Sequence, residues 1–459
     1  MQQYYVPQPK RTPSPQRQGE LIQFLIENQQ RIDDLWKKTS QPYMPWKKFE
    51  AAYRAGYFGA YWSEQQISVE DAWYLLQVRR RFTQTQSPVR DTRNEPFSWS
   101  KLPTHERLLH DFSMQLGGSM ATSTLADGAA KNQVFLRQSL IEEAIASSQL
   151  EGAATTRERA KKMFAEKRKP SSNGEWMIYN NYLTIKQIEE ETSNYPLSRD
   201  VLLALHVTMT TNTDIEPDQI GRWRTDDDDI VVKRLIHSEE MIAHVPPKEA
   251  MMQVELDRLL AFANDQDADE DFLNPITKAI IIHFWFAYLH PFCDGNGRLS
   301  RSLFYWYLMR HKYWLIGLVP ISTVIKKSPA QYADAYCFSE QYSNDLTYFI
   351  DYNLRKIEQA LVLFTQYMER KKDKINLIDR LLPEAGLNHR QKQALHHLLG
   401  KSDDTITVTQ HANFHEVSWI TASQDIKALQ AIGYLEATKR GQSVLYTASD
   451  RLKALLEDQ

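Results

Sequence analysis

The stretch Asn274–Arg301, NPITKAIIIHFWFAYLHPFCDGNGRLSR, joins one of the most apolar segments of the chain to a short polar loop. Asn274 can cap a helix, and Pro275 suits the first helical position. Pro291 disfavours helical backbone at His290, so the buried helix should end there. A second helix is expected to begin at Gly297 or Arg298. The stretch therefore predicts two helices joined by a polar loop.

This loop has the features of an anion-binding site. It leads into a helix N-terminus, where backbone N–H groups are unpaired and the helix dipole is positive. Gly295 and Gly297 let a ligand approach the backbone closely. Arg298 and Arg301 are three residues apart, so they share one helix face and can both contact anionic oxygens. The combination is typical of a phosphate-binding loop.

Three further side chains in the loop fit the same chemistry. Asp294 is a lone carboxylate of the kind that Mg²⁺ uses when phosphate oxygens and waters are its other ligands. Asn296 offers an amide donor to a charged oxygen. His290, at the end of an apolar helix, has a pKa suited to removing a hydroxyl proton near neutral pH. The alternative is a turn whose polar residues merely cap helices, but so many reactive side chains within twelve residues argue against it.

Chain length, net charge and cysteine content limit the possible domain number, partners and location. A chain of 459 residues is too long for one core, so two or three domains are expected. The net charge of -3 gives no general attraction to nucleic acid or to an anionic membrane. Two cysteines provide no disulfide framework and favour a reducing cytoplasm. No run of about 18 apolar residues exists, so no membrane span is expected.

Patterning along the chain predicts four regions. They are a disordered tail (1–19), an N-terminal helical region (20–125), a helical core (126–370) and a small C-terminal domain (371–459). Loops are expected near 41–46 and 87–97, and a charged linker near 370–374. Two short apolar β-type runs at about 230–245 indicate a hairpin. The main helices of the core are expected at 248–263, 273–289, 298–312, 328–341 and 344–369.

The segment HPFCDGNGRLSR, His290–Arg301, resembles the signature of the Fic family, His-x-Phe-x-(Asp/Glu)-Gly-Asn-Gly-Arg-x-x-Arg, at every fixed position. The surrounding helices, about 130–355, look like a Fic core. The resemblance implies a mainly α fold with a short β-hairpin flap. It also implies transfer of AMP from ATP to a Ser, Thr or Tyr hydroxyl of a target protein or of the chain itself.

The resemblance further implies a role for each residue of the loop. His290 would deprotonate the target hydroxyl, and Asp294 would hold Mg²⁺ between the α- and β-phosphates. The phosphates themselves would be bound by Gly295, Asn296, Gly297, Arg298 and Arg301.

Two details of that motif bear on the reaction. Arg298 would stabilise the β-phosphate side and Arg301 the γ-phosphate. The branch of the family that acts as a kinase carries alanine in place of Gly295 and lysine in place of Gly297. The two glycines therefore favour nucleotidyl transfer.

A second segment, SSQLEG, resembles the inhibitory motif of Fic proteins, (Ser/Thr)-x-x-x-Glu-(Gly/Asn), through Ser147, Glu151 and Gly152. Taken alone, Glu151 reads as a solvated glutamate at a helix end. The resemblance implies that it pairs with Arg301, blocks the γ-phosphate contact and repels the triphosphate.

In Fic proteins the hairpin flap aligns the target by main-chain pairing, and Tyr332 or Asn344 could stand near the base. The hairpin could instead be simply structural, and Tyr332 and Asn344 are equally credible as packing or capping residues.

The last residues read as helix, short strand, two helices and two strands, an order that resembles a winged helix-turn-helix. Residues 418–435 would hold the recognition helix and Lys439–Ser443 the wing. From 371 to 459 there are 12 Lys and Arg against 11 Asp and Glu, which is not the basic face of a DNA-binding domain. DNA binding, protein binding and homodimerisation all stay open.

The sequence as a whole therefore predicts a self-restrained protein adenylyltransferase that uses ATP and Mg²⁺. One alternative is that the same site removes AMP or transfers another phosphate-containing group. The other is a DNA-binding regulator in which the Fic core only senses nucleotide.

Overall fold

The helix that carries the apolar half of the quoted stretch is α12 (Pro275–Leu289). Its N-terminus is capped as expected, because the Asn274 side chain accepts a hydrogen bond of 2.9 Å from the Ile276 N–H. It ends at His290, whose φ of +48° is left-handed. The second helix, α13 (Asn296–Arg310), begins one residue earlier than expected.

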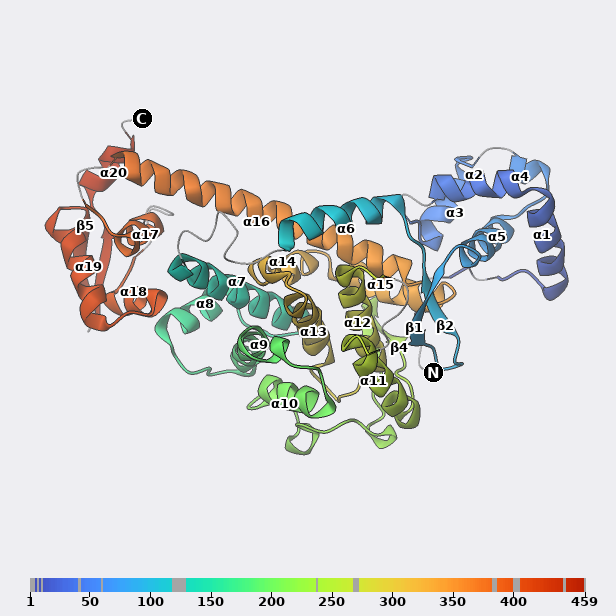
Figure 1. Ribbon diagram of the computed structural model, residues 1–459, viewed down its shortest axis with the longest axis horizontal. Coiled ribbons are helices and arrows are strands. Elements are labelled where there is room, and N and C mark those ends of the chain that lie inside the picture. The colour runs from blue at the N-terminus through green and yellow to red at the C-terminus, as the bar shows by residue number, and fades with distance from the viewer. Residues whose placement is uncertain are drawn as a thin grey trace.

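The computed structural model describes residues 5, 8–9, 11–39, 43–58, 61–117, 129–236, 238–266, 272–381, 386–398, 405–440 and 443–457. Within these ranges the chain is mainly helical, with three two-stranded antiparallel sheets. The predicted mainly α fold is therefore confirmed. Figure 1 shows an elongated molecule, with the N-terminal helices at one end, a helical core in the middle and the C-terminal elements at the other end.

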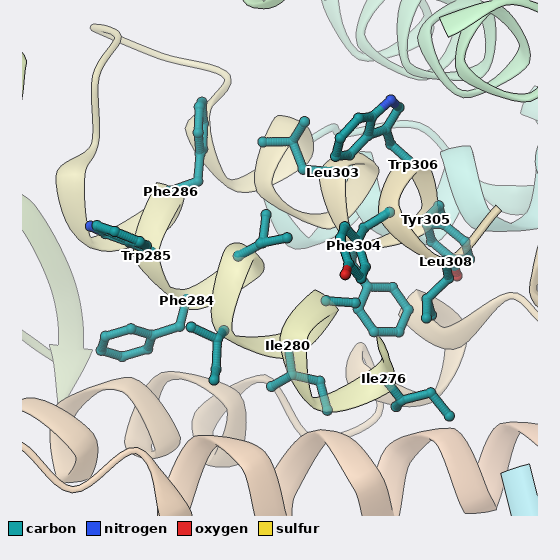
Figure 2. Close-up of a cluster of buried hydrophobic side chains, with 14 of the residues drawn as sticks. Ile276, Ile280, Phe284, Trp285, Phe286, Leu303, Phe304, Tyr305, Trp306 and Leu308 are labelled. Atoms are coloured by element: carbon teal, nitrogen blue, oxygen red, sulfur yellow. The ribbon is translucent and has the colours of Figure 1, made fainter. Parts of the chain in front are cut away.

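The core is built around α12 and α13. Helix α12 is apolar on every side because it contacts α11 (Glu249–Ala263), α13 and α16 (Thr347–Leu381). Figure 2 shows its apolar side chains, with those of α13, filling the space between these helices. Burying one such side chain stabilises a fold by about 1.5–3 kcal/mol. This packing fixes the two ends between which the polar loop runs.

The other core elements surround this pair. They are α7 (Ala129–Leu150), α8 (Arg157–Glu166), α9 (Asn173–Glu190), α10 (Arg199–Thr210), α14 (Ile321–Ile325) and α15 (Pro329–Gln341), with short 3₁₀ turns at Thr192–Asn194, Pro217–Gln219, Asp226–Asp228 and Trp314–Leu318. The predicted hairpin is present as β3 (Val232–Ile236) and β4 (Glu239–His244), paired antiparallel.

The N-terminal region has its own hydrophobic cluster. Its helices are α1 (Pro15–Glu27), α2 (Gln29–Thr39), α3 (Trp46–Arg54), α4 (Tyr61–Glu64) and α5 (Val69–Arg81). Tyr342 and Tyr348, from the junction of α15 and α16, belong to the same cluster and attach this region to the core. The following helix, α6 (Pro103–Leu116), packs with the core cluster instead.

Three sequence expectations need correction. The tail expected over 1–19 is wrong for 15–19, because the Ser14 hydroxyl caps α1 and Pro15 starts it; residues 1–4, 6–7 and 10 lie outside the described residues. The loop expected near 87–97 is instead part of a hairpin, β1 (Thr85–Arg90) and β2 (Pro96–Trp99), in which Val89 and Phe97 are buried.

The third correction concerns the linker expected near 370–374. Helix α16 runs unbroken from Thr347 to Leu381, since its charged C-terminal half contains good helix formers and neither glycine nor proline. The boundary expected after residue 370 therefore falls inside a helix. The boundary expected at 125 falls within 118–128, outside the described residues.

The C-terminal elements follow the expected order of helices and of the last two strands, but the expected short strand is only an isolated bridge between Ile406 and Tyr446, and a further helix, α20 (Asp450–Glu457), follows the strands. The elements before α20 are α17 (His389–Leu398), α18 (Val408–His415), α19 (Trp419–Ala431), β5 (Leu435–Arg440) and β6 (Ser443–Ala448). Their assignment as a winged helix stays a prediction, and Gly441 and Gln442 of the expected wing lie outside the described residues. Arg137 of α7 donates to the Asn413 carbonyl and to Glu416, both at 3.0 Å, so α18 contacts the helix that precedes Glu151.

Across the described ranges, no helix combines the length and the apolar character that a membrane crossing requires.

Candidate functional site

The backbone of the loop between α12 and α13 is held from outside by Arg224. Its Nε donates to the His290 carbonyl at 2.7 Å, its Nη2 to the Leu289 carbonyl at 3.2 Å, and its backbone N–H to the Pro291 carbonyl at 2.9 Å. Arg224 is only 4% exposed, so these bonds form in a largely dry environment. One side chain thus fixes the turn at which α12 ends.

An aromatic stack holds the middle of the loop. The buried Phe292 ring lies between His206, at 3.8 Å and nearly parallel, and Trp223, at 4.8 Å. The His206 Nε2–H donates to the Asp294 carbonyl at 3.1 Å, and its Nδ1 accepts from the Gly221 N–H at 3.1 Å. Burial lowers the pKa of His206 to about 4, which keeps this ring neutral and able to make both bonds.

Asn296 closes the loop on itself. Its Oδ1 accepts from the Phe292 N–H at 3.0 Å, and its Nδ2 donates to the Phe292 carbonyl at 2.8 Å. The side chain is 2% exposed. The Asn296 side chain thus makes two hydrogen bonds within the loop, and its binding of a phosphate oxygen stays a prediction. Asn296 also offers a ligand its backbone N–H at the start of α13.

His290 lies at the lip of the loop, half-buried. Its Nδ1–H donates to the Ala287 carbonyl at 3.3 Å, which leaves the lone pair on Nε2. Burial and, to a smaller extent, the neighbouring His244 lower the pKa of His290 to about 3, which is below the near-neutral value expected from the sequence. The ring is therefore a neutral imidazole with one free acceptor nitrogen, the state that a general base requires.

Arg298 is buried with most of its hydrogen-bonding capacity unused. Among the described residues, Nε and Nη2 have no hydrogen-bond acceptor, and Nη1 makes only a long bond of 3.4 Å to the Met209 carbonyl. Asp294 Oδ2 lies 3.6 Å from Nη2, and this aspartate is 53% exposed. Burying hydrogen-bond donors without acceptors destabilises a fold. This guanidinium is therefore well placed to bind an anionic ligand.

Arg301 is also buried, but it is paired with the segment SSQLEG. Its Nε donates to the Ser147 hydroxyl at 2.9 Å, and its Nη2 donates to the Ser147 carbonyl at 2.9 Å and to Glu151 Oε1 at 2.8 Å. The Glu151 side chain is 28% exposed. The structure therefore brings together all three predicted residues of this segment, because Gly152, with φ of +92°, ends α7 and turns the chain at Glu151.

The Glu151 carboxylate also lies directly over the backbone of Gly297. A Cβ on Gly297 would come within 2.2 Å of Glu151 Oε1. An anion thus already lies at the N-terminus of α13, where the dipole and free N–H groups favour negative charge. Any side chain at position 297 is incompatible with this placement of Glu151.

Replacing Gly297 with alanine is therefore expected to displace Glu151 from Arg301. Losing this charge-assisted bond should lower the free energy of unfolding by about 1–2 kcal/mol. In a Glu151→Gly background the same change should be neutral or slightly stabilising, since alanine favours a helix. Urea unfolding of the two single variants and the double variant measures this coupling. Additive effects would contradict the contact.

The structure gives structural roles to two residues whose roles the sequence left open, and sequence reasoning missed two others. Tyr332 hydrogen-bonds His283 at 2.8 Å and lies beside Arg301 rather than the base. Asn344 accepts from the Ser98 N–H through its carbonyl, a structural role. Arg224 and His206 were missed. A histidine within the apolar run LLALHVTM was a signal for His206, but nothing in sequence indicated which loop it would hold.

A protein-family model described as "Fic/DOC family" matches residues 196–308, which include the loop, His206 and Arg224. Over these residues the chain is similar to the Fic family. The matched Fic domain begins just before α10 and ends within α13.

The curated relatives share only part of the chain. "Protein adenylyltransferase fic-1" of Caenorhabditis elegans is 27% identical over 179 residues, 39% of this chain and 31% of the relative. "Protein adenylyltransferase Fic" of Drosophila mojavensis is 34% identical over 70 residues, 15% of this chain and 14% of the relative. The chain thus spans less than a third of the length of these relatives.

Among solved structures, a Fic family protein from Desulfovibrio desulfuricans G20 is 17% identical, with a TM-score of 0.49, covering 76% of this chain and 97% of that one.

Proposed function

We propose that this Fic protein is a protein adenylyltransferase whose activity is held back by its own Glu151. The observation that carries the proposal is the buried, under-bonded guanidinium of Arg298 next to the exposed carboxylate of Asp294, at the N-terminus of α13. This arrangement suits a nucleotide's phosphates. The names of the relatives, which are adenylyltransferases, support the same chemistry.

In this proposal ATP lies along the loop with its phosphates toward α13. The N–H groups at Gly295, Asn296 and Gly297 and the guanidinium of Arg298 bind phosphate oxygens. The Nε2 of His290 takes the proton of the target hydroxyl as its oxygen attacks the α-phosphorus. The bond from the α-phosphorus to the bridging oxygen breaks and pyrophosphate leaves. Positioning and charge neutralisation supply most of the rate.

Mg²⁺ fits the same loop through Asp294. Its carboxylate is half exposed, and one oxygen, Oδ2, faces Arg298 at 3.6 Å rather than forming a hydrogen bond. Mg²⁺ typically takes one or two carboxylates and completes its shell with waters and substrate phosphates. A bound Mg²⁺ would neutralise charge that builds up on the phosphates. Asp294 would hold it there.

Glu151 restrains the reaction by occupying Arg301. While the ion pair holds, Arg301 cannot bind a γ-phosphate, and the Glu151 carboxylate repels the triphosphate across Gly297. The Arg301 side of this ion pair is buried, so water only weakly screens the attraction between the two charges. ATP can then bind only with its phosphates displaced.

The position of a radiolabel on ATP tests the reaction. The chain is incubated with Mg²⁺, a panel of candidate target proteins and ATP labelled on either the α- or the γ-phosphate. Adenylyl transfer predicts label on protein from the α-position alone. Label from the γ-position would identify a kinase instead, and release of AMP from a labelled protein would identify removal.

The pH profile is a separate prediction. Because the pKa of His290 is lowered to about 3, the ring stays neutral throughout the range from pH 5.5 to 8. A base of ordinary pKa, about 6.5, would lose roughly tenfold in rate for each pH unit below that value. We expect kcat/KM for AMP transfer to show no such fall above pH 5.5. A loss of about fivefold between pH 6.5 and 5.5, which a base of pKa about 6.5 would show, would contradict a buried neutral base.

The C-terminal domain favours a protein partner over DNA. On the outer face of α19 the exposed residues are Trp419, Ile420, Gln424, Lys427, Ala428, Gln430 and Ala431, with a single positive charge. Asp425 does not face outward; it is buried and paired with Arg390 at 2.6 Å. A DNA-reading helix presents a basic face. A target protein or a second copy of this chain is the better match for this surface.

A further inference from the structure

A buried glutamate on α7 links this helix to α14. Glu143 is 3% exposed, and both of its carboxyl oxygens accept hydrogen bonds from Ser322. Oε2 accepts from the Ser322 backbone N–H at 2.9 Å, and Oε1 accepts from the Ser322 hydroxyl. Ser322 lies in the first turn of α14, which packs beside α7 (Figure 1). Glu143 therefore fastens α7 to a neighbouring helix.

Glu143 lies on the same face of α7 as the residues that bind Arg301. Glu143 and Ser147 are four residues apart, so they share one helix face, and Glu151 continues this spacing just beyond the helix end. Ser147 and Glu151 supply the hydrogen bonds to Nε and Nη2 of Arg301. The third nitrogen, Nη1, has no acceptor among the described residues. The inhibitory contact thus depends on where this face of α7 is held.

A movement of α7 away from Arg301 would disturb Glu143 as well. Glu143 and Arg301 line one small cavity of about 10 Å³, which is about the space of a single water molecule. Burial raises the pKa of Glu143, while its bonds to Ser322 and the nearby charge of Arg301 oppose that rise. A buried carboxyl group that lost both hydrogen-bond donors would destabilise the fold. The bonds to Ser322 therefore resist the displacement of α7.

We propose that Glu143 is a positioning residue for the inhibitory contact: its bonds to Ser322 fix α7 on α14 and so hold Ser147 and Glu151 at Arg301. The effect of this anchor on AMP transfer rests on the proposed function. The anchoring of α7 itself is a property of the fold, and it can be measured without nucleotide.

Helix α7 is expected to stay folded when Glu143 is replaced, because α9 holds a neighbouring face. Asn181 Nδ2 donates to the Ala144 carbonyl at 3.3 Å, and the Ser148 hydroxyl donates to the Met177 carbonyl at 3.1 Å. Apolar residues of α7 are also buried in a hydrophobic cluster with α8 and α9. Replacing Glu143 should thus loosen one contact of α7 rather than unfold the helix.

The first test measures the transfer of α-labelled AMP by a Glu143→Ala chain. Losing the two bonds should shift the balance between docked and released α7 by about tenfold, so AMP transfer should rise about tenfold. In a Glu151→Gly chain, where Nη2 of Arg301 is already free, adding Glu143→Ala should change the rate by less than about twofold. A general loss of stability would instead lower the rate in both chains.

Two further variants test whether the hydrogen bonds of Glu143 cause the effect. Glu143→Gln can keep both bonds, because its oxygen can accept from the Ser322 N–H while its amide donates to the Ser322 hydroxyl. This variant should stay inhibited. Glu255→Ala removes a glutamate of α11 that is 4% exposed, and it should not raise AMP transfer. An equal rise with Glu255→Ala would show that any buried glutamate has this effect, which would overturn the proposal.

Hydrogen exchange of the chain without nucleotide reports on the anchor directly. The backbone amides of residues 144–150 should exchange about tenfold faster in Glu143→Ala than in the parent chain or in Glu143→Gln. Faster exchange with no AMP transfer by any variant would support the anchor and reject the proposed function. Unchanged exchange, or an equal rise in AMP transfer from Glu143→Ala with and without Glu151, would show that Glu143 does not position the inhibitory contact.

Discussion

A chain with His290 replaced by alanine is expected to transfer AMP about 10²- to 10⁴-fold more slowly than the parent chain, the range that a positioned general base contributes. The free Nε2 of a neutral ring is the only part of His290 that the reaction uses, and alanine removes it. The rest of the loop is held by Arg224 and Asn296, so its shape should survive. The loss should therefore appear in kcat.

The measurement is single-turnover transfer of α-labelled AMP, with nucleotide binding followed separately by calorimetry. The matched control is His110→Ala, which removes an exposed histidine on α6. This variant should keep the parent rate. Binding of ATP should also stay within about twofold in His290→Ala, because His290 is not among the groups that hold phosphate. A His290→Ala chain with the full rate would exclude this residue as the base.

The second large expected effect is an increase in the rate of AMP transfer. Replacing Glu151 with glycine is expected to raise AMP transfer by about 10- to 100-fold, within the range of free energies that couple two states in regulated proteins. Arg301 keeps its two bonds to Ser147, so the guanidinium stays in place while its Nη2 is freed to bind the γ-phosphate. Removing the carboxylate also ends its repulsion of the triphosphate.

Two further variants test the cause of this increase. One removes the charge of Glu151 but keeps the size of its side chain, and the other removes a glutamate elsewhere. Glu151→Gln keeps the size of the side chain and removes its charge, so it should give an intermediate gain. Glu191→Gly, at an exposed glutamate that follows α9, should change nothing. Initial rates at several ATP concentrations would show whether KM or kcat moves. Equal rates for Glu151→Gly and the parent would remove the inhibitory role, and a lower rate would indicate that Glu151 takes part in the reaction.

The loop between α12 and α13 could be predicted because its determinants are local. The Asn274 cap, the proline after His290 and the two glycines each act within a few residues of the chain. They set where one helix ends and the next begins whatever surrounds them. The same local logic predicted the β3–β4 hairpin and a helix end near Glu151, where α7 ends at Leu150.

The errors came from places where tertiary packing overrides local pattern. A loop was expected near 87–97, yet these residues form β1 and β2, with Val89 and Phe97 buried against the core. The charged run near residue 372 looked like a linker, yet it continues a long helix. In both cases the local sequence pattern was present, but tertiary packing or the continuation of a preceding helix determined the secondary structure.

The sequence by itself determined a polar, glycine-containing loop between two helices with a histidine at its lip, since that motif lies within twelve residues. Only the tertiary structure decided how the loop is used: Glu151 reaches Arg301 across 150 residues, Arg224 fixes the loop's carbonyls, and Asn296 turns inward. These contacts depend on where distant segments pack, and that is set by the burial of the whole apolar core rather than by any local rule.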